Sequence, residues 1–286
     1  MQLSYYKCKE GNFGDDLNDW IWDALLPGWR DWDNDTTLIG IGTILTRQRL
    51  ANLEKTRVLV LGSGAGRSES PKLPLPLSWD FRSVRGPRTA KRLGLPSERA
   101  VTDPAVMISE FPEFQNLPKG DKPAFIPHYR TVRRLDWNAA CERAGMKYVS
   151  PSEESKTVIR SIASAPLVVA ESMHAVIIAD TFRVPWIPVR IMNRFDPEKW
   201  ADWAESMNIS IDIPPLFPTI SLLDIEIAPR LRRIQDRAFG YIESGFVVSR
   251  LSGLLKVPPR LSELDVLQER KRQYRAVLDQ VIADYG

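Results

Sequence analysis

Residues 57–66 read RVLVLGSGAG, and this stretch decides the fold class. Its first half is a short apolar run, typical of a strand that is buried on both faces of a sheet. The glycines that follow end the strand in a turn. Residues 81–88 (FRSVRGPR) show a related pattern, because a strand is followed by glycine and by a proline suited to the first position of a helix. Strands that alternate with helices indicate an α/β fold with parallel sheets.

The same alternation continues on both sides of this stretch. Towards the N-terminus we expect short strands at residues 2–7 and 38–41, with an amphipathic helix between them. Towards the C-terminus we expect another strand at residues 101–108. Residues 115–123 (QNLPKGDKP) are polar and rich in helix breakers, so they form the expected linker between two domains.

The pattern begins again after this linker. The strands predicted there are residues 124–127, 146–149, 167–170 and 186–189. The predicted helices are residues 136–144, a helix that begins at a capping box in residues 150–153, and residues 173–182. We therefore predict an α/β protein with two Rossmann-like domains, residues 1–118 and 119–215, and a helical tail at residues 216–286 that packs on them.

The composition is that of an ordinary globular protein, with 43% hydrophobic and 26% charged residues. The formal net charge of +3 is too small to indicate a nucleic-acid partner, but it suits an anionic small substrate or an acidic membrane surface. There is no apolar signal core and no stretch of about 18 apolar residues. Cys8 and Cys141 make neither a disulfide framework nor a metal site, so we expect a cytoplasmic protein with two free thiols.

Both histidines follow predicted strands, where ligands of parallel α/β sheets bind. His174 lies at the start of a helix, where it can bind an anion and donate a proton near neutral pH. The alternative is a buried histidine that is hydrogen-bonded to a backbone carbonyl. His128 precedes Arg130, whose planar guanidinium suits phosphate or carboxylate. The alternative for Arg130 is a surface arginine in a basic turn, and the sequence leaves both questions open.

Three further features lie after predicted strands in the first half. Arg85 ends the strand predicted at residues 81–85 and occupies a position where a ligand is expected. Residues 62–66 (GSGAG) match the dinucleotide motif G-x-G-x-x-G only in part, so they are weak evidence for such a cofactor. Asp15 and Asp16 near the start of a helix are either helix caps or catalytic carboxylates.

Six short motifs occur in a fixed order along the chain. They are residues 12–16 (NFGDD), 40–43 (GIGT), 62–64 (GSG), 83–89 (SVRGPRT), 103–105 (DPA) and 172–175 (SMHA). Together they resemble the motifs of the polysaccharide pyruvyl transferase family, in particular its exopolysaccharide, succinoglycan-type members. Residues 126–130 (IPHYR) and 200–209 (WADWAESMNI) also fit, so the resemblance covers roughly residues 4–212.

This resemblance implies two Rossmann-like domains that face each other across a cleft, as in GT-B glycosyltransferases. The C-terminal helices expected at residues 216–286 carry no motif of the family. It implies phosphoenolpyruvate as co-substrate, no metal and no other cofactor, and a sugar or lipid-linked oligosaccharide as acceptor. The product would be a pyruvate ketal.

The roles implied for individual residues follow the motifs. His174 is assigned to the donor phosphate and to the acid, and Asp15 or Asp16 to the acceptor hydroxyl; these roles can be exchanged. The residues assigned to substrate binding are Asn12, Gly42, Ser63, Gly64, Arg85, His128, Arg130, Ser172 and Met173.

One position departs from the family pattern. Members of the family usually have arginine two residues before the motif histidine, where it binds the donor phosphate, and this chain has Ser172. Arg130, Arg183 and Arg190 are candidates to replace it. This departure favours one alternative function, a non-catalytic role in a polysaccharide assembly complex. The similar fold leaves a second alternative, a nucleotide-sugar glycosyltransferase of GT-B type.

The tail suggests two alternative locations for its helices. Residues 230–237 are rich in arginine, and residues 246–255 are largely apolar. A basic segment beside an amphipathic one can bind the anionic inner face of the plasma membrane. The alternative is that the apolar residues pack on the two domains.

Overall fold

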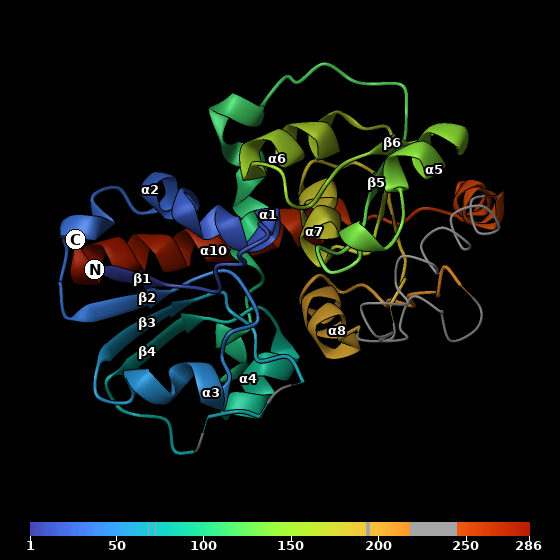
Figure 1. Cartoon of the computed structure of the whole chain (residues 1–286). Helices are drawn as coiled ribbons and strands as arrows, with labels where there is room; N and C mark the ends of the chain where they lie inside the picture. Colours follow the sequence, from blue (N-terminus) through green and yellow to red (C-terminus); the bar gives the residue numbers. More distant parts are fainter. Residues whose placement is uncertain (68, 72, 193–194, 218–244) are drawn as a thin grey trace. The chain divides into compact units, whose positions relative to one another are not determined.

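The computed structural model describes residues 1–67, 69–71, 73–192, 195–217 and 245–286 (Figure 1). The chain divides into two compact units. The first contains Met1–Gln115, Asp196–Ile211 and Ser262–Gly286, and the second contains Asn116–Phe195 and Asp212–Leu261. Each unit has a four-stranded parallel sheet of its own. The predicted α/β class with two parallel sheets is confirmed.

The first sheet has the strand order β1-β2-β3-β4, so strands that are consecutive in sequence are neighbours in space. Its strands are β1 (Gln2–Ser4), β2 (Thr36–Ile39), β3 (Arg57–Leu61) and β4 (Trp79–Ser83). The helices between and after them are α1 (Phe13–Asp16), α2 (Ile21–Leu25), α3 (Arg47–Leu50) and α4 (Pro87–Leu93). Apolar residues of β2, β3 and β4 pack with α3 and α4 in one buried cluster.

Gly40, directly after β2, shows how closely the helices approach this sheet. A Cβ atom at this position would lie 2.2 Å from the Trp22 ring of α2. Only glycine fits here, because the fully buried Trp22 side chain occupies the space that any larger residue would need. The GIGT motif therefore has a packing reason independent of any ligand.

The strand predicted at residues 101–108 is wrong. The structure has a 3-10 helix, η5 (Pro104–Glu110), at this place. Pro104 has no N–H for a strand ladder, and the Asp103 side chain accepts the backbone N–H of Ala105 at 3.0 Å. Capping and proline chemistry therefore outweigh the apolar composition of the segment.

The second sheet has the order β6-β5-β7-β8, in which β5 has the neighbours β6 and β7. Its strands are β5 (Ala124–Ile126), β6 (Lys147–Tyr148), β7 (Val168–Ala170) and β8 (Trp186–Pro188). Its helices include α5 (Trp137–Arg143), α6 (Ser155–Ser164) and α7 (Met173–Thr181). The predicted capping box at residues 150–153 is wrong, because the side chain of Glu154 caps α6 by accepting the N–H groups of Lys156 and Thr157.

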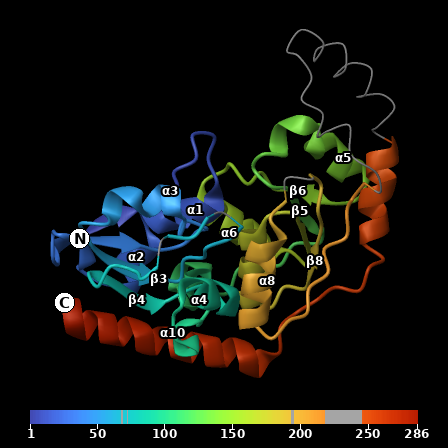
Figure 2. The ribbon, with the colours of Figure 1, turned by 90° about the horizontal axis from the view of Figure 1, so that it is seen from below.

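The C-terminal parts of the chain differ from the expected division at residues 119–215 and 216–286. Helix α8 (Pro197–Ser206) belongs to the first unit, where its residues Trp200 and Trp203 are buried. Helix α10 (Leu264–Tyr285) also belongs to the first unit and packs on β4 and η5 (Figure 2). The fully buried Tyr274 of α10 anchors this contact.

Of the two alternatives for the apolar tail segment, packing on a domain is the one seen in the structure, in the second unit. In the helical segment of residues 245–254, Val247 and Leu251 lie in the core formed with α5 and β7. Phe246 is 49% exposed and stacks on Phe217. The arginine-rich residues 230–237 lie outside the described residues, so membrane contact stays a prediction.

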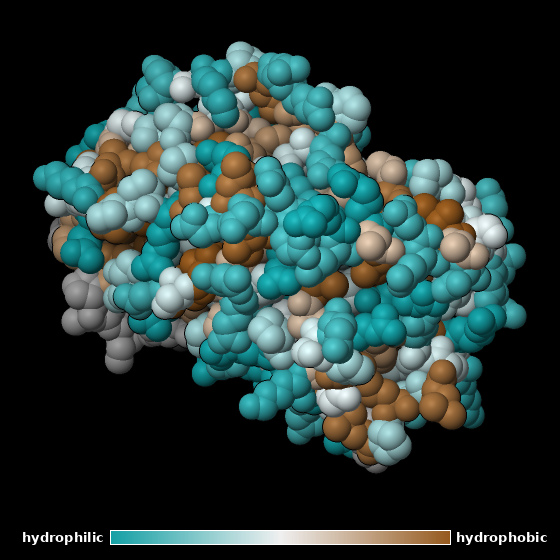
Figure 3. Space-filling model, turned by 180° about the vertical axis from the view of Figure 1, so that it is seen from behind, coloured by the Kyte–Doolittle hydropathy of each residue, from teal (hydrophilic) through white to brown (hydrophobic). Residues whose placement is uncertain are grey.

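In the part of the chain that the structure describes, few large apolar side chains are exposed. On the face in Figure 3, hydrophilic residues prevail and apolar ones appear in small groups. Among the described residues, the exposed large apolar side chains include Leu73 and Leu77. Within the same part of the chain, every helix is too short or too polar to span a bilayer.

Candidate functional site

The second sheet has a topological switch point between β5 and β7. The connection from β5 leads outwards to β6, and the connection from β6 returns across β5 to β7. Ile126 and Ala170, the last residues of β5 and β7, are direct partners in the sheet. Loops that leave such a point in different directions open a crevice at the carboxyl ends of the strands, where ligands of α/β proteins bind.

The loop after β5 brings His128, Tyr129 and Arg130 together. The rings of His128 and Tyr129 lie 4.4 Å apart, and the Arg130 guanidinium lies over the Tyr129 ring. The Arg130 Nε donates to the Tyr129 hydroxyl at 2.9 Å, and its backbone N–H donates to His128 Nδ1 at 3.4 Å. Arg130 is exposed, so its remaining donors can reach a ligand.

The loop after β7 leads into α7, whose first turn contains His174. Ser172 is the N-cap residue, but its side chain does not cap the helix. The first backbone N–H groups of a helix have no partner within it, and they favour an anion. His174 is therefore placed beside a helix N-terminus, with 8% of its surface exposed. That His174 and Arg130 lie close enough to bind one anion together stays a prediction.

The structure separates the candidates for the arginine that is absent at position 172. Arg183 follows the C-terminal end of α7, a nine-residue helix that is about 14 Å long. It therefore lies at the far end from His174. Arg130 and Arg190 follow β5 and β8, and so they lie at the carboxyl edge of the sheet with His174.

Sequence reasoning missed Glu171, which lies between β7 and α7. Its carboxylate is 3% exposed and accepts hydrogen bonds from the loops after β5 and β8. Burial raises the pKa of Glu171, and these hydrogen bonds lower it in part. A charged residue directly after the apolar run of residues 167–170 was the available signal in the sequence.

In the first unit, Asn12 distinguishes the two candidate aspartates of α1. The Asn12 backbone N–H donates to Asp16 at 3.0 Å, so Asp16 acts as a cap. Burial raises the pKa of Asp16, and this hydrogen bond lowers it in part. The Asn12 side chain donates to Asp15 at 2.6 Å. Asp15 faces Gly42, since a Cβ atom there would lie 3.4 Å from its Oδ1.

The α1 motif and the GIGT motif are joined by Asn18, a second residue that sequence reasoning missed. Its side chain is fully buried and donates to the backbone carbonyls of Asp15 and Ile41. It also accepts the Ile41 backbone N–H and the Trp22 indole N–H. These four bonds fix the position of Asp15 relative to the loop after β2.

Arg85, predicted to contact a substrate, has no exposed side-chain surface. Its Nε donates to Asp202 of α8 at 3.1 Å, and its Nη1 donates to Thr43 at 2.9 Å. Its guanidinium fills the space beside Gly64, where a Cβ atom would lie 2.1 Å from Nη2. Ser63 is also fully buried and donates to the Gly40 carbonyl. In this structure Arg85 and Ser63 hold the loops that end the first sheet.

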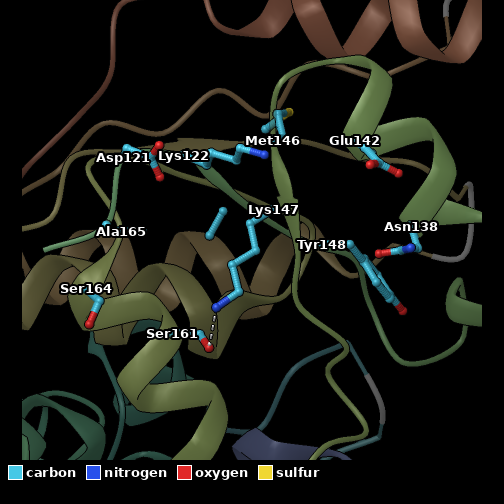
Figure 4. Close-up of a pocket in the computed structure, with 12 residues that line it drawn as sticks. Asp121, Lys122, Asn138, Glu142, Met146, Lys147, Tyr148, Ser161, Ser164 and Ala165 are labelled. Carbon is cyan, nitrogen blue, oxygen red and sulfur yellow. Dashed lines mark hydrogen bonds between the residues drawn. The ribbon is translucent and has the colours of Figure 1, made fainter. Parts of the chain in front are cut away.

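Two pockets lie at different ends of the sheets. One, of about 320 Å³, adjoins the ends of β1 and β2 in the first unit and is lined by Ser4, Tyr5, Ile39, Ile44, Gln48, Arg49, Leu50 and Asn52. Ile44 also lies next to Gly42, so this pocket is near Asp15. The other, of about 660 Å³, lies where β5 and β6 begin in the second unit (Figure 4). It contains Lys122 and Lys147 and is at the opposite edge of that sheet from His174.

Comparison with known proteins agrees with this arrangement of motifs. A family model described as polysaccharide pyruvyl transferase matches residues 4–191, which include strands of both sheets. The chain belongs to this family. It is also 36% identical to the succinoglycan biosynthesis protein ExoV of Rhizobium meliloti (strain 1021), in an alignment 318 positions long that covers 100% of both chains. The family predicted from the motifs is thereby confirmed.

The range matched by the family model includes the candidate site residues. The matched range contains the α1 motif, the loop after β5 and the first turn of α7, and it ends beside Met192. Helices α8 and α10 lie beyond it, although both complete the first unit. The similarity to ExoV extends over these helices as well.

Proposed function

We propose that this pyruvyl transferase family member moves the pyruvyl group of phosphoenolpyruvate onto a sugar diol of an exopolysaccharide repeat unit. The observation that carries the proposal is the switch point of the second sheet. His174 in the first turn of α7 and Arg130 after β5 come from adjacent strands there. A helix N-terminus, an imidazole and a guanidinium at one edge of a parallel sheet suit a ligand with phosphate and carboxylate groups.

The reaction needs one acid and one base. A proton is added to the methylene carbon of phosphoenolpyruvate, which becomes a methyl group and leaves C2 oxocarbenium-like. One sugar hydroxyl attacks C2 and loses its proton to the base, the C2–O bond to phosphate breaks, and a second hydroxyl closes the ketal ring. One of the two hydroxyl protons balances the methyl group, and the other leaves with phosphate.

We assign the donor groups to residues of the second unit. His174 binds the phosphate and supplies the proton, while Arg130 and His128 hold the carboxylate or phosphate. Ser172 and Met173 contribute backbone at the start of α7. Since Ser172 cannot supply the positive charge of an arginine, Arg130 and Arg190 are the cations assigned to that role.

We assign the acceptor to the first unit. Asp15 is the proposed base, because Asp16 is used as a cap and Asp15 faces Gly42. The pocket of about 320 Å³ beside it is lined by Tyr5, Gln48 and Asn52, which suit a sugar ring and its hydroxyls. A sugar of an exopolysaccharide is the proposed acceptor because the related ExoV is named for succinoglycan biosynthesis.

The test is phosphate release from phosphoenolpyruvate in the presence of lipid-linked oligosaccharide acceptors and without nucleotide. We expect phosphate release together with an acceptor product that carries a pyruvate ketal. Transfer that requires a nucleotide sugar would instead support a glycosyltransferase. Absence of turnover with every acceptor tried would support the non-catalytic alternative.

His174→Ala sharpens this test. We expect turnover to fall by at least about 100-fold, since an acid–base group is lost. Arg183→Ala is the matched control, because it changes a charged residue at the other end of α7 and should leave turnover within about twofold. An unchanged rate for His174→Ala would remove this residue from the mechanism.

A further inference from the structure

Glu171 accepts four hydrogen bonds from two segments of the second unit. Its Oε1 accepts the backbone N–H groups of Ile191 at 2.9 Å and Met192 at 3.0 Å. Its Oε2 accepts the His128 backbone N–H at 3.0 Å and the Thr131 hydroxyl at 2.7 Å. The side chain is 3% exposed, so water cannot replace these bonds without a rearrangement.

These four donors come from loops that follow neighbouring strands. His128 and Thr131 follow β5, and residues 191–192 follow β8, while Glu171 itself follows β7. The backbone of Glu171 is tied to β5 as well, because its N–H donates to the Ile126 carbonyl at 3.0 Å. One side chain therefore connects the segments that follow β5, β7 and β8.

The loop after β5 is held by Glu171 near both of its ends. His128 is bonded at the beginning of the loop and Thr131 at its end, with Arg130 between them. The Thr131 carbonyl in addition accepts the indole N–H of the buried Trp137 at 3.0 Å. Arg130 is thus exposed on a loop whose backbone is fixed at each side.

We propose that Glu171 is a positioning residue, which holds the loop of Arg130 and the segment after β8 beside the first turn of α7. It touches no substrate. It keeps the cationic groups of one crevice at fixed separations, so that an anion with phosphate and carboxylate groups meets a preformed site. This inference rests on the proposed function for its kinetic consequence, and on the hydrogen bonds alone for its structural one.

Glu171→Gln is the decisive variant, because it keeps the shape of the side chain. The amide has one oxygen that accepts and one NH₂ group that donates, so two of the four donors lose their acceptor. Asp180→Asn is the matched control. Asp180 is a buried carboxylate near the other end of α7 and accepts the Trp186 indole N–H at 2.9 Å.

The first readout is kinetic. For Glu171→Gln we expect kcat/KM for phosphoenolpyruvate to fall about 10- to 100-fold, with KM for the sugar acceptor changed less than twofold. For Asp180→Asn we expect both constants to stay within about twofold, whatever the loss in melting temperature. Equal changes in the two variants, or an unchanged kcat/KM in Glu171→Gln, would overturn the proposal.

The second readout does not depend on the activity. Amide hydrogen exchange at residues 128–131 and 191–192 should become faster in Glu171→Gln and stay unchanged in Asp180→Asn. If the wild-type protein does not turn over phosphoenolpyruvate, the proposed function fails, and exchange alone decides the role of Glu171. Unchanged exchange in Glu171→Gln would refute that role even if the enzyme is active.

A milder variant covers the case in which Glu171→Gln does not fold. Thr131→Val removes one of the four donors and leaves the carboxylate in place. We expect a smaller change of kcat/KM in the same direction, about threefold, together with faster exchange at residues 128–131. If Thr131→Val behaves like the wild-type protein in both measurements, the proposal is contradicted.

Discussion

Each of the two sheets has a buried carboxylate at the edge where its strands end, but the two carboxylates are stabilised differently. Asp202 accepts the guanidinium of Arg85 at 3.1 Å and the hydroxyl and backbone N–H of Thr89. Glu171 accepts three backbone N–H groups and one hydroxyl, all of them neutral. The loops of the first sheet are held by an ion pair, and those of the second by hydrogen bonds to an anion.

This difference suggests what each edge can do. At the first edge the charges of the buried Arg85 and Asp202 offset each other. At the second edge the protonation of Glu171 changes the local charge, because its pKa is raised by burial. A site for an anion beside such a group should depend on pH.

The largest effect is expected when the ion pair of the first sheet is broken. Asp202→Ala leaves the fully buried Arg85 without its carboxylate, which should cost about 3–5 kcal/mol of unfolding free energy. Urea denaturation measures this loss. The double variant Arg85→Met with Asp202→Leu should recover part of it, since an apolar pair replaces both charges while the two Thr89 donors lose their acceptor. A double variant as unstable as Asp202→Ala would show that the pairing itself is not what stabilises this edge.

The next effect is a pH dependence that belongs to Glu171. A carboxylate whose pKa is raised in the folded state binds its proton more tightly there than in the unfolded chain. Its contribution to stability is complete below the ordinary glutamate value of 4.5 and is lost as the pH rises through the raised pKa.

The melting temperature of the wild-type protein should therefore fall relative to that of Glu171→Gln as the pH rises from 4.5. Parallel melting curves of the two proteins over that range would show that the four hydrogen bonds outweigh burial and keep the carboxylate ionised. Asp180→Asn serves as the reference for effects of a buried amide as such.

The two sheets also show which features of the fold could be predicted from the sequence. The apolar runs at residues 57–61 and 167–170 identify strands, because a strand that is buried on both faces consists almost entirely of apolar residues. The order of the loops and the family followed from short motifs. The strand expected at residues 101–108 failed because local capping by Asp103 competes with apolar composition.

The buried Arg85–Asp202 pair and the buried Glu171 carboxylate could not be predicted from the sequence, for a different reason. Arg85 and Asp202 are separated by 117 positions, and only the fold brings them together. Arg85 was therefore interpreted as a ligand contact rather than as half of an ion pair. Glu171 was missed because its partners are backbone N–H groups, which every residue has and which leave no pattern in the sequence.

The smallest effects compare the two threonines that contact these charged groups. Thr43→Val removes the hydroxyl that accepts Arg85 Nη1 at 2.9 Å, and Thr131→Val removes the hydroxyl that donates to Glu171 at 2.7 Å. Thr43 is partly exposed, so water can replace its hydroxyl, whereas Thr131 is fully buried. We expect losses of about 0.5–1 kcal/mol for Thr43→Val and about 1.5–3 kcal/mol for Thr131→Val in urea denaturation. The larger loss at Thr131 would mean that the hydroxyl stabilises a buried anion whose four hydrogen-bond donors are all neutral. Equal losses would mean that the two edges depend equally on their neutral hydroxyls, and the distinction drawn between an ion pair and a hydrogen-bonded anion would then have no measurable consequence for stability.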